Sequence, residues 1–208
     1  MCIRDRSKIS SSLTTYAKSA DLNKFGGRFK YSKVSTLIDR VDNGITSNIT
    51  KVIVRRDLKA LLNQFAQYEL CYGNKFNINP AGYNIKSTGF SVSGVDGTVY
   101  IADRVVEGSN IGNLFLFKLT DDIDVEIVSS NVGTVDYKKG EILINTINIT
   151  STLLPENIIE IQAVPLSNDV LGIGTEKVKV LNIDSLSSRI NSNFLFDVSR
   201  FTLPYISE

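Results

Sequence analysis

The chain has 208 residues, 42% of them hydrophobic and 22% charged, which is enough for one large domain or two small ones with a real core. It has no His and no Trp, so Ser-His-Asp and Cys-His catalysis and His-ligated metals are excluded, and two cysteines alone cannot form a zinc site. No apolar run approaches the ~18–20 residues that a membrane-spanning helix needs. We therefore expect no catalytic residues, cofactor or metal, and an enzyme is the weakest interpretation.

The net charge of +1 conceals two opposed halves of the chain. Residues 1–80 contain 14 Lys or Arg and 6 Asp or Glu, whereas residues 81–208 contain 9 and 16. A basic first half could bind a polyanion, or it could pack against the acidic half of another copy.

The first six residues, MCIRDR, resemble a translated sequencing-adapter remnant. We therefore expect residues 1–6 to be an artefact and the chain to be a fragment of a longer protein. The polar segment 7–31 gives only a weak indication of a helix, around Leu13–Ala20.

A clearer helix is predicted next. Apolar residues recur on one helical face, with Ser32 where an N-cap belongs and Asn43-Gly44 as a stop: Val34, Leu37, Ile38, Val41 and Ile45. Two strands are then predicted, at Asn48–Val54 and Tyr68–Tyr72. Together these elements predict a small α+β unit over residues 7–78, in which Cys71 is a strand residue without a nucleophilic role.

After the turn Asn77–Gly82 the pattern is almost wholly β, and an antiparallel β domain is predicted over residues 79–165. Asp96-Gly97 predicts a hairpin between Phe90 and Ile101. Two more hairpins are predicted, the first from 113–119 to 123–127 and the second from 132–137 to 141–149. A bulge near Asn145-Thr146 would keep the isoleucines of the last arm on one face. Ile159, Ile161 and Ala163 continue the alternation.

Residues 166–208 are expected to form a loop and a C-terminal tail, with a short helix near Ile183–Ile190. The GIGTEK segment at 172–177 lacks the Walker spacing and is interpreted as a surface loop. The tail is apolar and could dock on its own domain or on a neighbour: Phe194, Phe196, Val198, Phe201, Leu203 and Tyr205. The predicted fold class is therefore α+β and β-rich, a helix-plus-strands unit followed by antiparallel hairpins.

Two charged groups suggest binding chemistry. Acidic residues that could offer oxygen ligands to calcium alternate with apolar ones, which favours a solvent-facing strand edge: Asp121, Asp122, Asp124 and Glu126. A basic group interleaved with Phe25, Phe29 and Tyr31 could bind nucleic acid, but it could equally face acidic protein: Arg28, Lys30, Lys33, Arg40, Lys51, Arg55, Arg56 and Lys59.

Several segments together carry a family resemblance. These are KFGGRFKYSK at 24–33, IDRVDNGITSNITKVIV at 38–54, YELCYGNKF at 68–76 and VGTVDYKKGEILI at 132–144. They resemble the C-terminal half of the baseplate wedge subunit of T4-like contractile-tailed bacteriophages, the ring-forming wedge protein. The hairpin at 136–141 is less specific, because it is similar to baseplate J-like proteins generally. The resemblance covers about residues 20–170.

The resemblance implies a structural, non-enzymatic virion protein of the tail baseplate, assembled in the host cytoplasm. It implies binding to further copies of itself and to other wedge proteins, and no membrane or small-molecule substrate. We expect Arg55 and Arg56, and the tail residues Phe194, Phe196 and Phe201, at subunit contacts. Two alternatives remain open: a β-rich tail module that binds host-surface carbohydrate or receptor, and a nucleic-acid-binding protein that uses the basic half.

Overall fold

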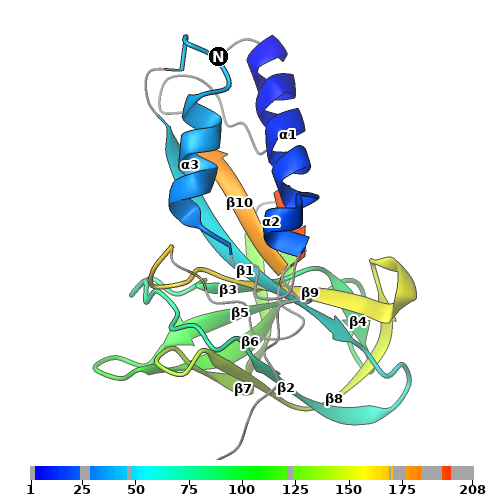
Figure 1. The fold of residues 1–208 in the computed structure, drawn as a ribbon. Coiled ribbons are helices and arrows are strands. Elements are labelled where there is room, and N and C mark those ends of the chain that lie inside the picture. The colour runs from blue at the N-terminus through cyan, green and yellow to red at the C-terminus, as the bar shows by residue number, and fades with distance from the viewer. Residues whose placement is uncertain are drawn as a thin grey trace, which may run out of the picture. The chain divides into compact units, whose positions relative to one another are not determined.

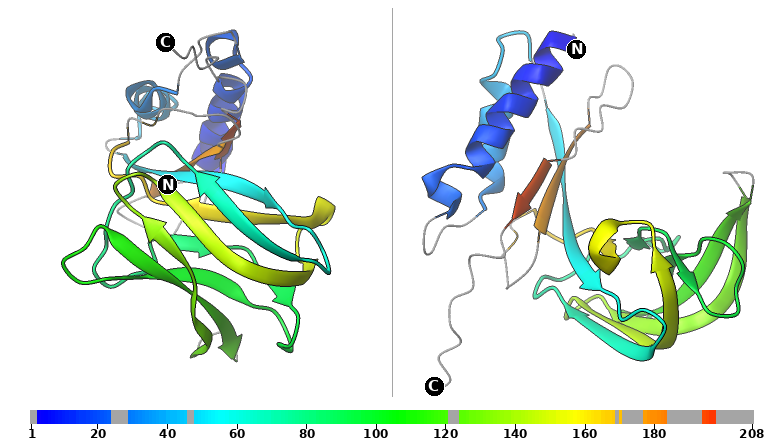
Figure 2. Two further views of the ribbon diagram at one scale, coloured as in Figure 1. Left: turned by 90° about the horizontal axis from the view of Figure 1, so that it is seen from below. Right: turned by 90° about the vertical axis from the view of Figure 1, so that its right-hand side faces the viewer.

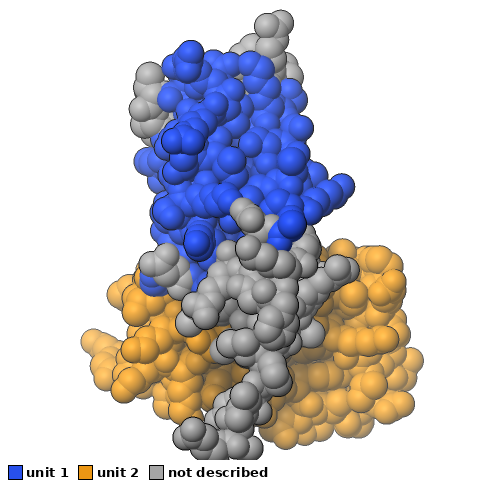
Figure 3. Space-filling model, in the orientation of Figure 1, with its two compact units in different colours: residues 1–54, 167–208 blue, residues 55–166 orange. Residues whose placement is uncertain are grey.

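The computed structural model describes residues 3–23, 29–45, 48–120, 124–168, 170, 177–183 and 194–197. The chain divides into two compact units, the first made of residues 1–54 and 167–208 and the second of residues 55–166 (Figure 3). The division proposed from the sequence at residues 78 and 79 falls inside the second unit, whereas the one at 165 and 166 lies next to its end. Strand β1 (Ile49–Lys59) runs from the first unit into the second.

The first unit packs helices on one face of a small sheet (Figure 1). Its helices are α1 (Ile3–Ala17), α2 (Ala20–Asn23) and α3 (Tyr31–Asp39), and α1 packs against α3. Beside β1 lies β10 (Lys177–Ile183), which pairs antiparallel with β11 (Phe194–Asp197). The core side chains recur at helical spacing on α1 and α3 and at alternate positions on β1: Ile9, Leu13, Tyr16, Val34, Ile38, Val52 and Val54.

Both helical predictions need correction. The weak helix expected around Leu13–Ala20 is a 15-residue helix, α1, because Ile9 and Leu13 supply a continuous buried stripe. Helix α3 ends at Asp39, earlier than the periodicity suggests, because the Asp42 side chain accepts a hydrogen bond from the Gly44 backbone at 3.0 Å and holds a local turn. The N-cap of α3 is Lys30, not Ser32.

The second unit is an antiparallel sheet that curls around its own core (Figure 2). Its strand order is β1-β9-β3-β5-β6-β7-β8-β2, with β4 paired to β8. The strands after β1 are β2 (Phe65–Cys71), β3 (Ile85–Ser87), β4 (Phe90–Val92), β5 (Tyr100–Val105), β6 (Ile111–Thr120), β7 (Asp124–Asp136), β8 (Glu141–Thr152) and β9 (Ile158–Ala163). A 3-10 turn, Pro155–Asn157, precedes β9. The coarse prediction of a β-rich α+β protein is confirmed.

Two of the three predicted hairpins form as expected. β6 and β7 pair from Thr120 and Asp124 onward, and β7 and β8 pair from Asp136 and Glu141. The Asp136 side chain accepts hydrogen bonds from the backbone of Lys138 and Lys139, both at 3.0 Å, which fixes the tight turn.

The predicted bulge is also present. The register between β2 and β8 passes from Ala66 opposite Ile147 to Tyr68 opposite Ile144, so β8 has one extra residue at 145–146. Ile142, Ile144 and Ile149 are buried as a result, and Ile147 is half-buried.

The hairpin around Asp96-Gly97 is reduced to a single bridge, which corrects the prediction. Phe90 and Val99 exchange two backbone hydrogen bonds, at 3.1 and 2.8 Å. Beyond them β4 pairs with the end of β8, and β5 pairs with β3 and β6. Because β5 is already paired on both sides, β4 pairs with the long β8 instead, and the tertiary pairing overrides the local turn signal. The expected helix near Ile183–Ile190 and the GIGTEK loop lie outside the described residues, apart from strand β10.

Candidate assembly surfaces

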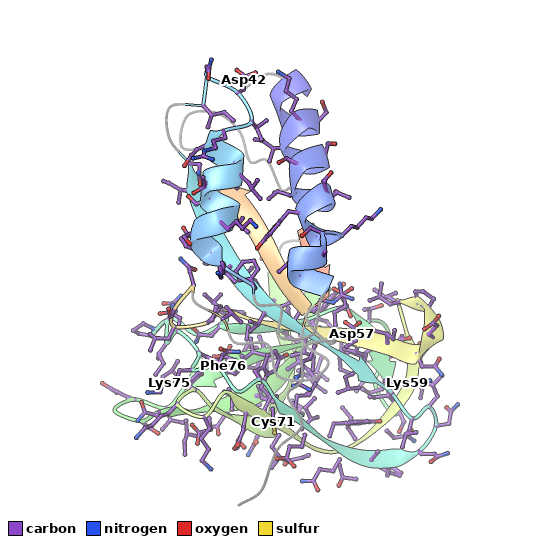
Figure 4. The ribbon with its side chains drawn as sticks, in the orientation of Figure 1. Asp42, Asp57, Lys59, Cys71, Lys75 and Phe76 are labelled. Carbon is purple, nitrogen blue, oxygen red and sulfur yellow. The ribbon has the colours of Figure 1, made fainter. Side chains whose placement is uncertain are left out.

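Arg55, expected at a subunit contact, is held by acidic partners inside the second unit. Its Nε lies 2.7 Å from Asp57 Oδ1 and its Nη1 lies 2.6 Å from Glu160 Oε1. The three side chains are only 15–17% exposed. Asp57, labelled in Figure 4, shares β1 with Arg55, and Glu160 comes from β9. The arginine therefore pins β1 to β9 in the order β1-β9 of the sheet.

Arg56 packs on the other side of the same strand. Its guanidinium carbon lies 5.7 Å from the centroid of the Tyr72 ring, a cation–π geometry. The Tyr72 hydroxyl donates to the Ile161 carbonyl at 2.7 Å, and its ring meets Phe76 edge-on at 5.1 Å. Arg56 therefore also contributes to the packing of its own unit. Whether either arginine reaches a partner stays a prediction.

The predicted tail residues are placed only in part. Phe194 and Phe196 lie in β11, opposite Val180 and Val178 of β10. Phe201 lies outside the described residues.

The first unit presents a basic surface. Six basic side chains are exposed among the described residues of this unit: Lys8, Lys18, Lys30, Lys33, Arg40 and Lys51. The acidic side chains described in the same unit are Asp39 and Asp42. Lys8 Nζ lies 2.7 Å from Asp42 Oδ2, and this hydrogen bond, with the backbone of Gly44, holds the pKa of Asp42 below its usual value. Lys33 lies 5.1 Å from the centroid of the Tyr16 ring. The remaining charge faces solvent and can steer an acidic partner.

This surface lacks the stacking rings that single-stranded nucleic acid uses, as far as the described residues show. Phe29 is buried, and the Tyr31 hydroxyl is tied to the Thr50 carbonyl at 3.1 Å. Phe25 and Arg28, part of the same predicted group, lie outside the described residues.

None of the residues that the structure describes in the first unit is seen to cover the face of β1 opposite the helices. Thr50, Val52 and Val54 point to the helical side and are buried, whereas Ile49 is 57% exposed. Lys51 is exposed on the same side as Ile49, and Ile53 is half-buried there.

The second unit carries an apolar strip on the outer face of β5, β6 and β7. Tyr100 is opposite Phe117, which is opposite Ile127, and Leu119 is opposite Val125. The rings of Tyr100 and Phe117 stack at 5.6 Å. An exposed apolar strip of this kind is a candidate interaction surface.

Beneath that face lies a buried polar network that sequence reasoning missed. Asp103 is 0% exposed and Tyr137 is 1% exposed, and the Tyr137 hydroxyl donates to Asp103 Oδ2 at 2.5 Å. The Asn84 amide donates to the same oxygen at 2.8 Å, and the Ile85 backbone donates to Oδ1 at 2.6 Å. The sequence could have indicated this network, because Asp103 follows Ile101 by two positions in β5 and so shares its inward-facing side of the strand.

The hydrogen-bond network around Asp103 also positions the exposed ring of Tyr83. Tyr83 precedes Asn84, has a positive φ of 58° and donates its backbone N–H to the Asp103 carbonyl at 3.0 Å. Its ring lies edge-on to Phe115 and Phe117, at 5.8 and 6.3 Å. A left-handed backbone at a tyrosine is held only where its surroundings fix it, and the buried Asp103 does so here.

The described residues offer no evident metal or small-molecule site. No group of three or more His, Cys, Asp or Glu side chains is placed together among them. Of the predicted acidic cluster, Asp124 and Glu126 are exposed on β7, and Asp121 and Asp122 lie outside the described residues. An apolar cavity of about 10 Å³, lined by residues such as Ile144, Ile147 and Ile161, is too small and too apolar for an ordered water. None of the described helices is long and apolar enough to cross a membrane.

Comparison with known proteins shows which family one segment of this chain resembles. A search of curated proteins found no match. Residues 5–57 match the family model described as "Baseplate structural protein gp6, C-terminal domain III". The match spans α1, α2, α3 and the strand β1 up to Asp57, which includes the exposed cations and the face of β1 opposite the helices. The resemblance found in the sequence is confirmed over residues 5–57, which are similar to a domain of a baseplate structural protein.

Proposed function

We propose that this protein links neighbouring wedges of the baseplate into a ring, by binding further copies of itself and other wedge proteins. On this proposal it is a scaffold and not an enzyme. The observation that carries the proposal is the match of residues 5–57 to a domain of a baseplate structural protein. That segment displays six exposed cations, and its described acidic side chains are Asp39, Asp42 and Asp57.

Two further features support an assembly role. The first unit exposes a basic surface, whereas the second contains more acidic than basic residues, so unlike surfaces of neighbouring subunits attract each other. The second unit also exposes an apolar strip on β6 and β7. Heterologous contacts between different surfaces of identical copies close into rings when the rotation permits.

Within this proposal Arg55 and Arg56 mark the end of the matched segment and remain candidates for a place near a contact. Because both already pack inside the second unit, we propose that they support a contact surface rather than reach across it. Phe194, Phe196 and Phe201 are proposed as apolar anchors of the C-terminal segment on a neighbouring subunit.

Co-expression with the other wedge proteins of the same phage tests the function. We expect this chain to copurify with them as a complex of defined mass. A triple variant, Lys30→Glu with Lys33→Glu and Arg40→Glu, should weaken the complex, because these exposed cations lie within α3 or at its two ends in the matched segment. A control with Lys138→Glu and Lys139→Glu, at the β7–β8 turn, should not. Wedges that assemble fully while excluding this chain would refute the proposal.

A further inference from the structure

The chain contains one Asn-Gly pair, Asn43-Gly44, in the turn that follows α3. Both residues are exposed, and the Ile45 backbone N–H donates to the Asp42 carbonyl at 3.1 Å, which closes a turn around them. The pair lies within the segment that matches the family model. An asparagine followed by glycine readily loses its side-chain amide, because glycine has no Cβ to keep its backbone nitrogen away from the asparagine side chain.

This reaction needs only the chain and water. The backbone nitrogen of Gly44 attacks the side-chain carbon Cγ of Asn43, a bond forms between these two atoms, and the bond from Cγ to the amide nitrogen breaks. The amide nitrogen leaves as ammonia and carries away the hydrogen of the Gly44 N–H. Water then adds to either carbonyl of the resulting cyclic imide and opens the ring. The product is aspartate, or isoaspartate, in which the main chain runs through the former side chain.

The attacking nitrogen is held by a neighbouring carboxylate. The Gly44 backbone N–H donates to Asp42 Oδ1 at 3.0 Å, and Asp42 Oδ2 accepts from Lys8 Nζ at 2.7 Å (Asp42 is labelled in Figure 4). Lys8 comes from α1, which packs against α3. The hydrogen bonds from Lys8 and Gly44 lower the pKa of Asp42, so its carboxylate is charged near neutral pH. The Gly44 nitrogen therefore has to leave this bond before it attacks Asn43.

We propose that Asn43 is a site of spontaneous deamidation, and that the Lys8–Asp42 pair sets its rate by holding the Gly44 N–H. The pair joins α1 to the turn after α3, so local opening of this contact frees the nitrogen. Deamidation adds a negative charge next to Asp42 on the exposed basic surface. A further consequence rests on the proposed function: the modified chain should bind an acidic partner surface less tightly.

Peptide mapping of the incubated full chain by mass spectrometry detects the site. Exchange of the side-chain amino group for a hydroxyl shifts the mass of the peptide that holds Asn43, and chromatography separates its aspartate and isoaspartate forms. We expect this product to accumulate faster at Asn43 than at any other asparagine of the chain. Gly44→Ala should lose most of the product, because the added methyl group hinders the attack. The fold accepts this change, since Gly44 has no positive φ and an added Cβ would lie 3.4 Å from Asp42 Oδ1.

The role of the Lys8–Asp42 pair is measured as protection. The deamidation rate of each folded variant is divided into the rate of the same variant unfolded in guanidinium chloride, which cancels the effect of neighbouring sequence. The folded parent should react about tenfold more slowly than its unfolded form. Asp42→Ala should lose most of this protection, and Lys8→Ala should lose part of it, because Lys8 acts through Asp42. The matched control is Lys18→Ala, which removes an exposed lysine just past the end of α1 and should keep the full protection.

The outcomes test the site and its control separately. If Asn43 stays intact in the folded chain while the unfolded chain reacts completely, it is not a modification site of the folded protein. If Asn43 reacts but Asp42→Ala and Lys18→Ala are equally protected, the Lys8–Asp42 pair does not set the rate.

Both measurements use the isolated chain, so they are independent of the proposed function. The effect on partners is measured with Asn43→Asp in the co-expression experiment, where a complex as stable as that of the parent would overturn this consequence alone. If the parent itself forms no complex, the proposed function fails and the deamidation site stands.

Discussion

The hydroxyl of Tyr137 donates a hydrogen bond to the buried carboxyl group of Asp103, with 2.5 Å between the two oxygens. Tyr137 directly follows β7 and Asp103 lies in β5, so the bond connects the two strands that flank β6. Gly112 of β6 makes room for it, because a Cβ at that position would overlap the Tyr137 hydroxyl. The hydrogen bond between Tyr137 and Asp103 therefore stabilises, from inside the core, the strands whose outer face carries the apolar strip.

Removing the hydroxyl should destabilise the second unit. Tyr137→Phe leaves Asp103 with the Asn84 and Ile85 donors but without its shortest partner. Loss of a hydrogen bond to a buried charged group costs about 1.5–3 kcal/mol. Urea denaturation should show this decrease in the free energy of unfolding. An unchanged midpoint would mean that the bond contributes nothing to stability.

The same pair predicts an alkaline limit of stability. Burial, together with the hydrogen bond and charge of Asp103, raises the pKa of Tyr137 far above its usual value. An unfolded tyrosine has a pKa of about 10, so its contribution is complete below that pH and is lost as the pH rises further. The free energy of unfolding should therefore fall above about pH 10, and Tyr137→Phe should reduce the fall. Equal slopes in the parent and the variant would contradict the assignment.

Replacing Arg55 should lower the free energy of unfolding of the second unit, because the arginine forms ion pairs within that unit. Arg55→Met leaves Asp57 and Glu160 facing each other, with 17% of each side chain exposed. We expect a loss of about 1–3 kcal/mol in the free energy of unfolding, measured by denaturant titration. Lys59→Met is the control, because Lys59 is exposed at the end of the same strand and its removal should cost no more than about 0.5 kcal/mol. If the two variants unfold alike, the ion pairs do not pin β1.

The first turn of α3 is poorly capped, and this can be improved. Lys30 occupies the N-cap with extended backbone angles and makes no side-chain capping bond. Lys30→Ser should stabilise the first unit by about 0.5–2 kcal/mol, because a serine hydroxyl can accept a bond from an early helical N–H. Ser32→Ala should change stability little, since Ser32 lies inside the helix. Thermal unfolding of both variants checks this, and a larger loss for Ser32→Ala would restore the N-cap predicted from the sequence.

Cys71 should react slowly despite its exposed position at the end of β2, labelled in Figure 4. Partial desolvation, and then the neighbouring Glu69, raise the pKa of its thiol, which lowers the thiolate fraction near neutral pH. In a Cys2→Ser background, the rate of reaction with a disulfide reagent at pH 8 should be below that of free cysteine. Glu69→Gln should raise the rate by about twofold. A faster reaction than that of free cysteine would contradict this environment.

The sequence predicts best where one local signal and the tertiary fold agree. The β7–β8 turn follows from Lys138-Lys139-Gly140 between two alternating runs, and the bulge at 145–146 follows from isoleucines that change parity. The hairpin at Asp96-Gly97 fails because β8 is long enough to pair with β4 in its place. Helix α3 stops early because the Asp42 side chain competes with the helical backbone.

The candidate surfaces were less accessible to sequence reasoning. Arg55 and Arg56 look like free cations in the sequence, because their partners Glu160 and Tyr72 are distant along the chain. The alternation around Phe117 and Ile127 predicts strands, but only the register places the two side chains opposite each other on an exposed face. Pairing between distant segments is the information that a single sequence does not carry locally.

Cross-linking mass spectrometry on purified phage baseplates tests the central claim most directly. The exposed lysines of the first unit, Lys8, Lys18, Lys30, Lys33 and Lys51, provide reactive positions on the matched segment. We predict cross-links from these lysines to other wedge proteins and between copies of this chain. Baseplates in which these lysines link only within one copy of the chain, or which lack the chain altogether, would contradict its role as a link between wedges.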